Sequence, residues 1–234
     1  MTVEDKPLWV LGYGSLIFKP PPHAKFRIPG IIYNYARRFW QSSSDHRGCV
    51  ETGLGRVVTL IPYEDIIKHK DIKEDVKYFN NLADDFKEND LKLWGCAYYI
   101  PSEHAQKVRD YLDIREQDGY TIHEIPFELH IDEKEHQFDN EFQKSIDSLP
   151  RDPKSGKHVL ISTVYIGTLD NASFIGPEKL EKTAEIISHA KGASGPNFEY
   201  LEKLHHTLRD LDDEEEDKYL SQLLDKVVEI RNNK

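Results

Sequence analysis

Short runs of apolar residues alternate with polar segments along the first hundred residues, and this pattern is typical of strands. The runs are rich in β-branched and aromatic residues and end at proline or glycine. They predict strands at 8–13, within 28–40, at 55–62 and at 93–100. The intervening segment 64–91 is rich in Asp, Lys and Asn, and it predicts a short helix followed by a surface loop.

Helical spacing dominates the second half of the chain. Apolar residues recur every three or four positions after Ser102, which we expect to cap a helix ending near 113–116. The same spacing predicts a helix over 136–149, and apolar runs predict strands at 120–130 and 158–167. Three helices are expected to follow, at 176–190, 196–211 and 213–231, and prolines begin the first two.

Strands with inserted helices, followed by helices alone, predict an α+β fold whose sheet curls toward a barrel. A regular alternation of strands and helices would instead favour a dinucleotide-binding fold. With 234 residues and no long linker, the chain is expected to form a single domain over 1–234, with a helical C-terminal extension from about residue 205. The last helix has one apolar face and is expected to cover the barrel; contact with a partner or a second copy is the alternative.

Composition and charge narrow the range of partners. The formal net charge is −11, so neither nucleic acid nor a membrane surface is expected to bind. Seven of the eight residues from Asp210 to Asp217 are acidic, which is typical of a solvated loop or helix start. Two cysteines without a spaced Cys/His cluster predict neither a disulfide scaffold nor a metal site. Without a signal peptide, the protein is expected in the cytoplasm, with the nucleus as a second compartment.

Candidate chemistry begins where the first strand ends, in Gly12-Tyr13-Gly14-Ser15. Glycines let a ligand approach the backbone closely, and such a loop can hold a small anion or a developing oxyanion. A simple turn is the alternative. A second candidate is 111–120, where an acid at a helix end can be partly buried and gain the raised pKa that a general base needs.

Two further stretches offer groups for an anionic ligand. Segment 36–48 contains arginines that suit a carboxylate, although neighbours on a strand point to opposite faces, so Arg37 or Arg38 is expected to be structural. Asp45 and His46 lie near serines, but adjacent residues rarely form a hydrolase triad. Segment 190–201 contains a glycine turn before a helix, whose first amides could face a carboxylate.

Taken together, these stretches resemble the ChaC-like, glutathione-specific γ-glutamylcyclotransferases, and the fungal members most of all. The resemblance covers about residues 8–208 in the same order. Its motifs are Gly-Tyr-Gly-Ser-Leu at 12–16, Arg-Arg-Phe-Trp-Gln at 37–41, Asp-His-Arg-Gly at 45–48, Arg-Glu-Gln-x-Gly-Tyr at 115–120, Val-Tyr-Ile-Gly at 164–167 and Gly-x-Ser-Gly-x-Asn-x-Glu-Tyr-Leu at 192–201.

The resemblance implies a small mixed β-barrel flanked by helices. It also implies an enzyme without metal or organic cofactor that converts reduced glutathione to 5-oxoproline and Cys-Gly. Separately from the resemblance, we expect the protein to be a monomer. Glu116 matches the family's catalytic glutamate and is the expected general acid and base. The expected substrate-binding residues are Val10, Leu11, Gly12, Tyr13, Gly14 and Ser15 in the loop, together with Arg38, Tyr120 and Tyr165; Arg47 is the alternative to Arg38.

Several alternatives remain open at this point. The enzyme could act on other γ-glutamyl amino acids or amines, or the chain could be an inactive module that binds γ-glutamyl peptides. Gln117 stands where many relatives have lysine, which questions a positive neighbour beside the catalytic glutamate. Rival carboxylates are Glu103, Glu124 and Glu199, and only Glu199 lies in a recognisable motif.

Overall fold

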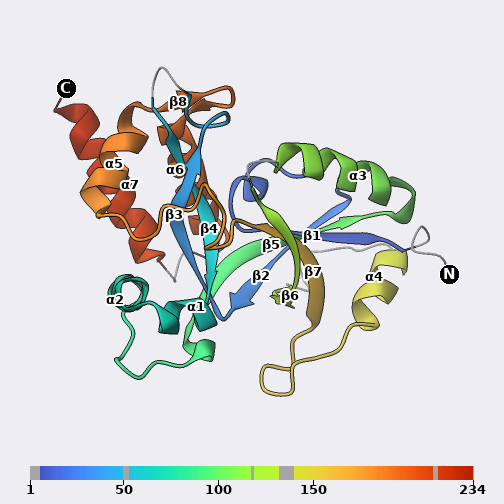
Figure 1. Ribbon diagram of the computed structural model, residues 1–234. Helices are drawn as coiled ribbons and strands as arrows, with labels where there is room; N and C mark the ends of the chain where they lie inside the picture. The colour runs from blue at the N-terminus through green and yellow to red at the C-terminus, as the bar shows by residue number, and fades with distance from the viewer. Residues whose placement is uncertain (1–5, 50–52, 117–118, 132–139, 213–215, 234) are drawn as a thin grey trace.

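A closed five-stranded barrel forms one side of the molecule (Figure 1). The computed structural model describes residues 6–49, 53–116, 119–131, 140–212 and 216–233. The strand order is β1-β5-β2-β6-β7; neighbours are antiparallel, except that β1 closes the barrel against β7 in parallel. The strands are β1 (Leu8–Gly12), β2 (Phe26–Tyr33), β5 (Lys92–Ile100), β6 (Thr121–Leu129) and β7 (Val159–Ile166).

A second layer stands beside the barrel. Its strands are the antiparallel pair β3 (Tyr35–Ser43) and β4 (Gly55–Pro62). Three helices, α5 (Leu180–His189), α6 (Asn197–Arg209) and α7 (Lys218–Asn232), pack beside this pair (Figure 1). The two-residue strands β8 (Lys191–Gly192) and β9 (Gly195–Pro196) form a small hairpin before α6.

The remaining helices lie around the two layers. Helix α3 (Ser102–Arg115) follows β5 along the barrel, and α4 (Asn140–Asp147) lies at its far side (Figure 1). Helices α1 (Tyr63–Lys68) and α2 (Lys70–Phe79) pack below the β3–β4 pair. The described residues also form two 3-10 turns, η2 (Ser15–Ile17) and η3 (Glu88–Asp90).

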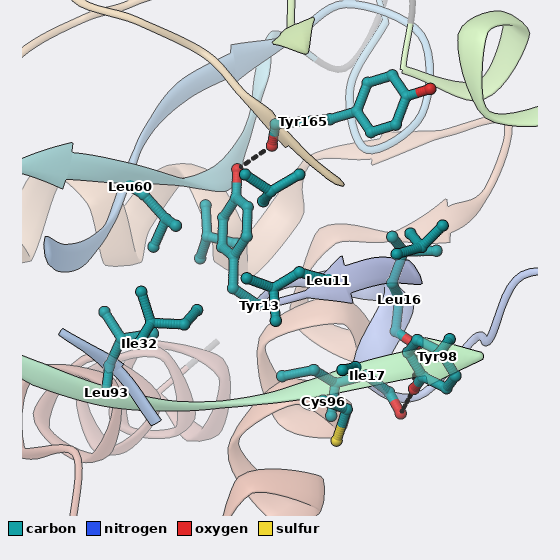
Figure 2. Packing of buried hydrophobic residues seen from close by; sticks show 14 of the residues in the cluster. Leu11, Tyr13, Leu16, Ile17, Ile32, Leu60, Leu93, Cys96, Tyr98 and Tyr165 are labelled. Atoms are coloured by element: carbon teal, nitrogen blue, oxygen red, sulfur yellow. Dashed lines mark hydrogen bonds between the residues drawn. The ribbon is translucent and has the colours of Figure 1, made fainter. Parts of the chain in front are cut away.

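One large core joins the barrel to the C-terminal helices. Its barrel part includes Leu11, Ile32 and Tyr98, whose hydroxyl donates a hydrogen bond to the carbonyl of Leu16 at 2.8 Å (Figure 2). Leu204 of α6 and Leu223 of α7 belong to the same core and are fully buried. Such a continuous core indicates that the two layers fold as one unit.

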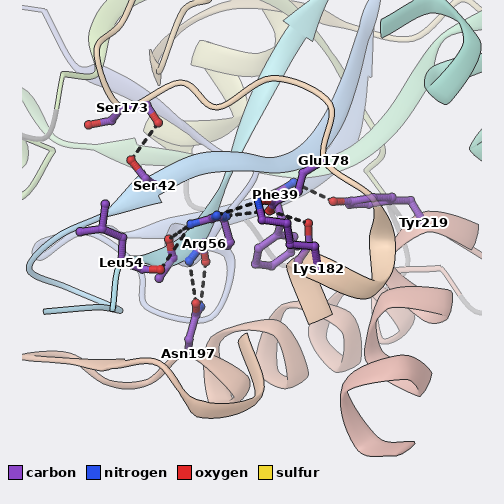
Figure 3. Close-up of polar contacts among 11 residues, drawn as sticks. Phe39, Ser42, Leu54, Arg56, Ser173, Glu178, Lys182, Asn197 and Tyr219 are labelled. Carbon is purple, nitrogen blue, oxygen red and sulfur yellow. Dashed lines mark hydrogen bonds and ion pairs between the residues drawn. The ribbon is translucent and has the colours of Figure 1, made fainter. Parts of the chain in front are cut away.

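Hydrogen bonds and an ion pair connect the β3–β4 pair to α6 and to the segment before α5 (Figure 3). The side chain of Asn197 accepts from the N–H of Arg56 at 2.6 Å and donates to its carbonyl at 2.7 Å. The guanidinium of Arg56 binds both carboxylate oxygens of Glu178, at 3.0 and 3.1 Å. These bonds satisfy buried polar groups that would otherwise destabilise the fold.

The predicted α+β barrel is confirmed, and strands lie in all six predicted regions. One prediction was too coarse: the region 28–40 holds parts of two strands, because Asn34 adopts a φ of 70° and turns the chain between β2 and β3. Segment 64–91 holds two helices and a 3-10 turn rather than one helix. Ser102 is the first helical residue and Pro101 occupies the cap.

Helix boundaries account for the other differences. Of the helix predicted at 136–149, residues 136–139 lie outside the described residues and the rest begins at Asn140. The helix predicted from 176 begins at Leu180, and the last helix begins at Lys218. Residue 205 lies inside α6, so no element boundary falls there. Helix α7 packs mainly on α5 and α6, and its apolar face joins the core that these helices share with the barrel.

No helix in the described ranges is both long and apolar enough to cross a membrane.

Candidate active site

A cavity of about 260 Å³ opens between the barrel and the β3–β4 pair. The loop after β1, the end of α3 and β7 form its barrel side, and β3, β4 and α6 form the other side. Five of the six sequence motifs, far apart along the chain, contribute lining residues, among them Tyr13, Gly14, Ser15, Arg47, Arg115, Glu116, Tyr165, Ser194 and Tyr200.

The loop after β1 enters the cavity from the barrel end. Tyr13 is buried, and its hydroxyl donates to the carbonyl of Tyr165 at 2.8 Å, which ties the loop to β7 (Figure 2). A Cβ atom at Gly14 would stand 2.7 Å from a methyl carbon of Val58 and 3.0 Å from the hydroxyl of Tyr200. Glycine is therefore required here for the loop to approach β4 and α6.

Glu116 stands at the C-terminal end of α3. Its N–H donates to the carbonyl of Leu112 at 2.8 Å, which fixes its backbone as the helix cap. Its side chain lines the cavity and is only 16% exposed. Burial raises the pKa of Glu116, while the charges of Arg115 and His46 oppose the rise. A carboxylate with a raised pKa facing a cavity has the properties of a general base.

Arg115 joins this glutamate to the loop. One guanidinium nitrogen donates to the hydroxyl of Ser15 at 2.8 Å, and a second donates to the carbonyl of Lys19 at 3.2 Å. Its Nε atom lies 3.5 Å from a carboxylate oxygen of Glu116. Because a guanidinium is planar and rigid, these contacts fix the loop and the glutamate relative to each other.

A second arginine and a histidine line the opposite wall. Arg47 donates to the carbonyl of Pro196 at 3.1 Å, and its guanidinium carbon lies 5.4 Å from the ring centre of Tyr200. Burial lowers the pKa of Arg47, and the nearby charge of Arg115 adds to the shift. The ring nitrogens of His46 lie 3.2 Å from the hydroxyl of Ser194 and 3.2 Å from the carbonyl of Arg115.

Tyrosine hydroxyls complete the lining. Tyr120 donates to the carbonyl of Val58 at 2.9 Å, and Tyr165 donates to a carboxylate oxygen of Asp113 at 2.8 Å. Burial, together with the bond to Asp113, raises the pKa of Tyr165 well above its ordinary value. Burial likewise raises the pKa of Tyr13. Tyr13 and Tyr165 therefore stay neutral near pH 7 and position the loop and β7.

The structure brings most of the predicted residues together. Lining the cavity are Leu11, Tyr13, Gly14, Ser15, Glu116, Tyr120, Tyr165 and the alternative Arg47. Val10 and Gly12 belong to β1 and lie behind this lining, where they pair with Tyr98 and Cys96 of β5. Their part is to support the loop through the strand.

Arg38 is a correction, because its side chain does not reach this cavity. It is 2% exposed, and its Nε atom donates to Asp75 at 2.7 Å. A second nitrogen donates to Asn80 at 2.9 Å, and the guanidinium lies over the ring of Tyr219 at 4.6 Å. Arg38 thus joins β3 to α2 and α7. We expected one of Arg37 and Arg38 to be structural. The side chains of both arginines are buried, and neither lines this cavity.

Sequence reasoning did not single out Arg115, His46 or Tyr200 as site residues. All three stand inside motifs that were recognised, so the motifs themselves were the available signal. Tyr200 lies on α6, and its approach to Gly14 depends on tertiary packing.

The rival carboxylates do not line the cavity. Glu103 and Glu124 are exposed, and Glu199 pairs with Lys203 at 3.5 Å on the surface of α6. Gln117 lies outside the described residues. Among the described side chains, no group of three His, Cys, Asp or Glu residues could hold a metal ion.

Comparison with known proteins identifies the family. The family model described as ChaC-like protein matches residues 8–230. The chain is 48% identical to the glutathione-specific gamma-glutamylcyclotransferase of Saccharomyces cerevisiae, over 99% of this chain and 100% of that one. It is 38% identical to the protein of the same name from Schizosaccharomyces pombe, over 92% of this chain and 90% of that one.

Structural comparison agrees with the sequence. A crystal structure of the yeast γ-glutamylcyclotransferase specific to glutathione matches with a TM-score of 0.90 at 48% identity. The match covers 97% of this chain and 98% of that chain, so it includes the barrel, the β3–β4 layer and the C-terminal helices. The chain therefore belongs to the ChaC-like family and has the γ-glutamylcyclotransferase fold.

Proposed function

We propose that this chain is a glutathione-specific γ-glutamylcyclotransferase with Glu116 as its general acid and base. The observation that carries the proposal is a carboxylate with a raised pKa, buried beside the glycine loop in one cavity. The names of its relatives in two yeasts supply the reaction and the substrate. The reaction is a lyase-type cleavage that yields 5-oxoproline and Cys-Gly.

The ring closure needs the γ-glutamyl group to fold back on itself. The α-amine must approach its own side-chain carbonyl carbon, and holding it there supplies most of the advantage of an intramolecular reaction. The loop containing Tyr13, Gly14 and Ser15 lines the cavity, and we expect it to hold the polar end of this group. Burial and the charge of Arg115 both lower the pKa of Arg47, and a substrate carboxylate beside Arg47 would offset these effects.

Glu116 then moves the protons. Its carboxylate takes a proton from the substrate ammonium, which frees the lone pair that attacks the γ-carbonyl carbon. The C–N bond of the ring forms and a tetrahedral oxyanion develops. After the attack the ring nitrogen carries two hydrogens and a positive charge. The carboxyl group returns its proton to the departing nitrogen of the Cys-Gly part as the original amide bond breaks, and its carboxylate then takes the second proton from the ring nitrogen and passes it to the same amine, which leaves as an ammonium group. No proton is gained or lost overall, and Glu116 ends as it began.

A product assay separates the candidate substrates. Purified protein is incubated with reduced glutathione, oxidised glutathione or γ-Glu-Ala, and 5-oxoproline and the released peptide are measured by mass spectrometry. We expect 5-oxoproline and Cys-Gly from reduced glutathione alone. Product mainly from γ-Glu-Ala would move the substrate to other γ-glutamyl amino acids, and no product from any of the three would favour a binding module.

The monomeric state and the cytoplasmic location of the protein stay predictions.

A further inference from the structure

The lining of the candidate active site changes from buried to exposed across the cavity. Tyr13, Arg47 and Tyr165 are buried, whereas Ile114 is 69% exposed and Lys19 is also exposed. All of these side chains line the same cavity. The exposed residues therefore mark its mouth, and the buried residues mark its closed end.

The charged side chains that line this cavity do not balance. Its Lys and Arg residues are Lys19, Arg47 and Arg115, and among the described residues its single acid is Glu116. Arg115 lies 3.5 Å from Glu116, whereas Lys19 and Arg47 form no ion pair within the described ranges. Glu199 acts on Arg47 from outside the lining. Two cations in the lining therefore remain without a partner in direct contact, which favours an anionic ligand.

Glutathione carries a complementary set of charges. Its γ-glutamyl end has an ammonium and a carboxylate group, and its glycine end has a second carboxylate. Glu116 meets the ammonium in the proposed reaction, so two carboxylates remain for two cations. Arg47 lies at the closed end, where the γ-glutamyl group reacts, and Lys19 lies at the mouth. Because the Cys-Gly part must extend away from Glu116, its terminal carboxylate would point toward the mouth.

The backbone of Lys19 is held through both of its polar groups. Its N–H donates to the carbonyl of Ser15 at 2.9 Å, and its carbonyl accepts from the guanidinium of Arg115 at 3.2 Å. These bonds fix Lys19 to the glycine loop and, through Arg115, to the end of α3 beside Glu116. The origin of its flexible side chain is therefore set relative to the reacting end of the substrate.

We infer, on the basis of the proposed function, that Lys19 binds the glycine carboxylate of glutathione and thereby favours the tripeptide over shorter γ-glutamyl compounds. One extended residue spans about 3.3 to 3.6 Å. When the γ-glutamyl groups occupy the same place, the terminal carboxylate of γ-Glu-Ala stops short of the mouth by about that length. The attraction to Lys19 weakens with distance, and water weakens it further.

A competition between glutathione and its glycine ethyl ester tests this role. The ester keeps the γ-glutamyl and cysteine parts and lacks the terminal negative charge. Both compounds are mixed at equal concentration with the enzyme, and Cys-Gly and its ethyl ester are measured by mass spectrometry. Their initial ratio equals the ratio of the two kcat/KM values. Because both compounds compete for the same enzyme molecules, a partly unfolded variant gives the same ratio as a fully folded one.

We expect the wild type to favour glutathione about two- to fivefold, as for one partly solvated ion pair. Lys19→Gln should bring the ratio close to one, and Lys19→Arg should keep the preference, because it keeps the charge. The matched control is Lys107→Gln, which removes an exposed charge of α3 outside the cavity lining and should keep the wild-type ratio. Added salt should reduce the wild-type preference, since it screens exposed charges.

The outcomes separate this role from the reaction itself. Release of 5-oxoproline with a wild-type ratio near one, or with an unchanged preference in Lys19→Gln, would overturn the role of Lys19 and leave the proposed reaction in place. An equal loss of preference in Lys107→Gln would also overturn it, because the effect would then come from the overall charge. If neither compound released 5-oxoproline, both the proposed function and the role of Lys19 would be wrong.

Discussion

At the scale of single residues, Glu116 combines two opposing demands. A base must be ionised to accept a proton, yet the burial that excludes water from the cavity favours the neutral acid. Arg115 and His46 offset part of that effect, because both favour the carboxylate. Their balance leaves the pKa raised, which makes this group a better proton acceptor than an exposed glutamate.

Replacing Glu116 by glutamine removes the base and keeps the shape. We expect kcat/KM for glutathione to fall by about 10²- to 10⁴-fold, the usual contribution of a general acid–base group. The measurement is the rate of 5-oxoproline release. Glu103→Gln, an exposed carboxylate at the other end of α3, should keep the wild-type rate. Wild-type turnover in Glu116→Gln would refute the assignment.

The same variant has an expected effect on stability. Because the folded pKa of Glu116 is raised, the neutral form favours the native state below the unfolded pKa, and this stability is lost as the pH rises through the folded pKa. Glu116→Gln cannot ionise, so its melting temperature relative to wild type should be higher at pH 7 than at pH 4. A loss of activity together with this gain would separate catalysis from unfolding.

Arg115 positions Glu116 and its charge lowers the pKa of that carboxyl group. The dependence of kcat/KM on pH should report this effect. The acid limb of kcat/KM should lie above the ordinary glutamate pKa of about 4.3, since activity is lost as falling pH protonates Glu116. Arg115→Met removes a charge that lowers this pKa, so the limb should move to higher pH. Arg115→Lys keeps the charge and should leave the limb near its wild-type position. An unmoved limb in Arg115→Met would contradict the electrostatic role.

At the scale of elements, one buried ion pair joins the strand pair to the helices. Glu178, just before α5, is 7% exposed and binds both ends of the Arg56 guanidinium on β4 (Figure 3). Burial alone would raise the pKa of Glu178, but hydrogen bonds from Arg56, Lys182 and Thr183 bring it down to about 2. The pair therefore favours the folded state whenever the carboxylate is ionised.

Glu178→Gln should lower the free energy of unfolding at pH 7 by about 3 to 5 kcal/mol, because it leaves the buried guanidinium without its counter-charge. With a depressed folded pKa, this contribution is present above the unfolded pKa of about 4.3 and disappears as the pH falls toward 2. Urea unfolding of wild type and variant at pH 7 and pH 3 checks both statements. Glu181→Gln, on the exposed face of α5, is the control. Equal destabilisation at both pH values would point to packing rather than charge.

Strands and helices were easier to predict from the sequence than contacts between side chains. Period-two and helical spacing located the strands and helices, since those patterns follow from burying one face. The division at Asn34 was missed because a single residue with positive φ leaves the apolar pattern unbroken. Arg38 was misplaced for a different reason: a strand residue beside a motif can face either side, and only packing shows that Asp75 and Tyr219 enclose it. Tyr200 needed the same long-range information.

At the scale of the whole molecule, the candidate active site lies where two layers meet. The barrel supplies the loop and Glu116, whereas the β3–β4 pair and α6 supply Arg47 and Tyr200. Neither layer alone contains the complete lining. The geometry of the site therefore depends on the core that joins the layers, and α7 reaches that core through Leu220, Leu223 and Val227.

This dependence makes a final prediction about α7. Leu223 is fully buried, so Leu223→Ala should lower the free energy of unfolding by about 2 to 5 kcal/mol, the usual range for a core leucine. Val228, on the same helix, is 39% exposed, and Val228→Ala should change it by less than about 1 kcal/mol. Thermal and urea unfolding measure both. If α7 instead served mainly to contact a partner, Leu223→Ala would leave the isolated protein as stable as Val228→Ala does. Because α7 completes the core behind α6, we expect the opposite, with glutathione turnover lost at a lower temperature in Leu223→Ala than in wild type.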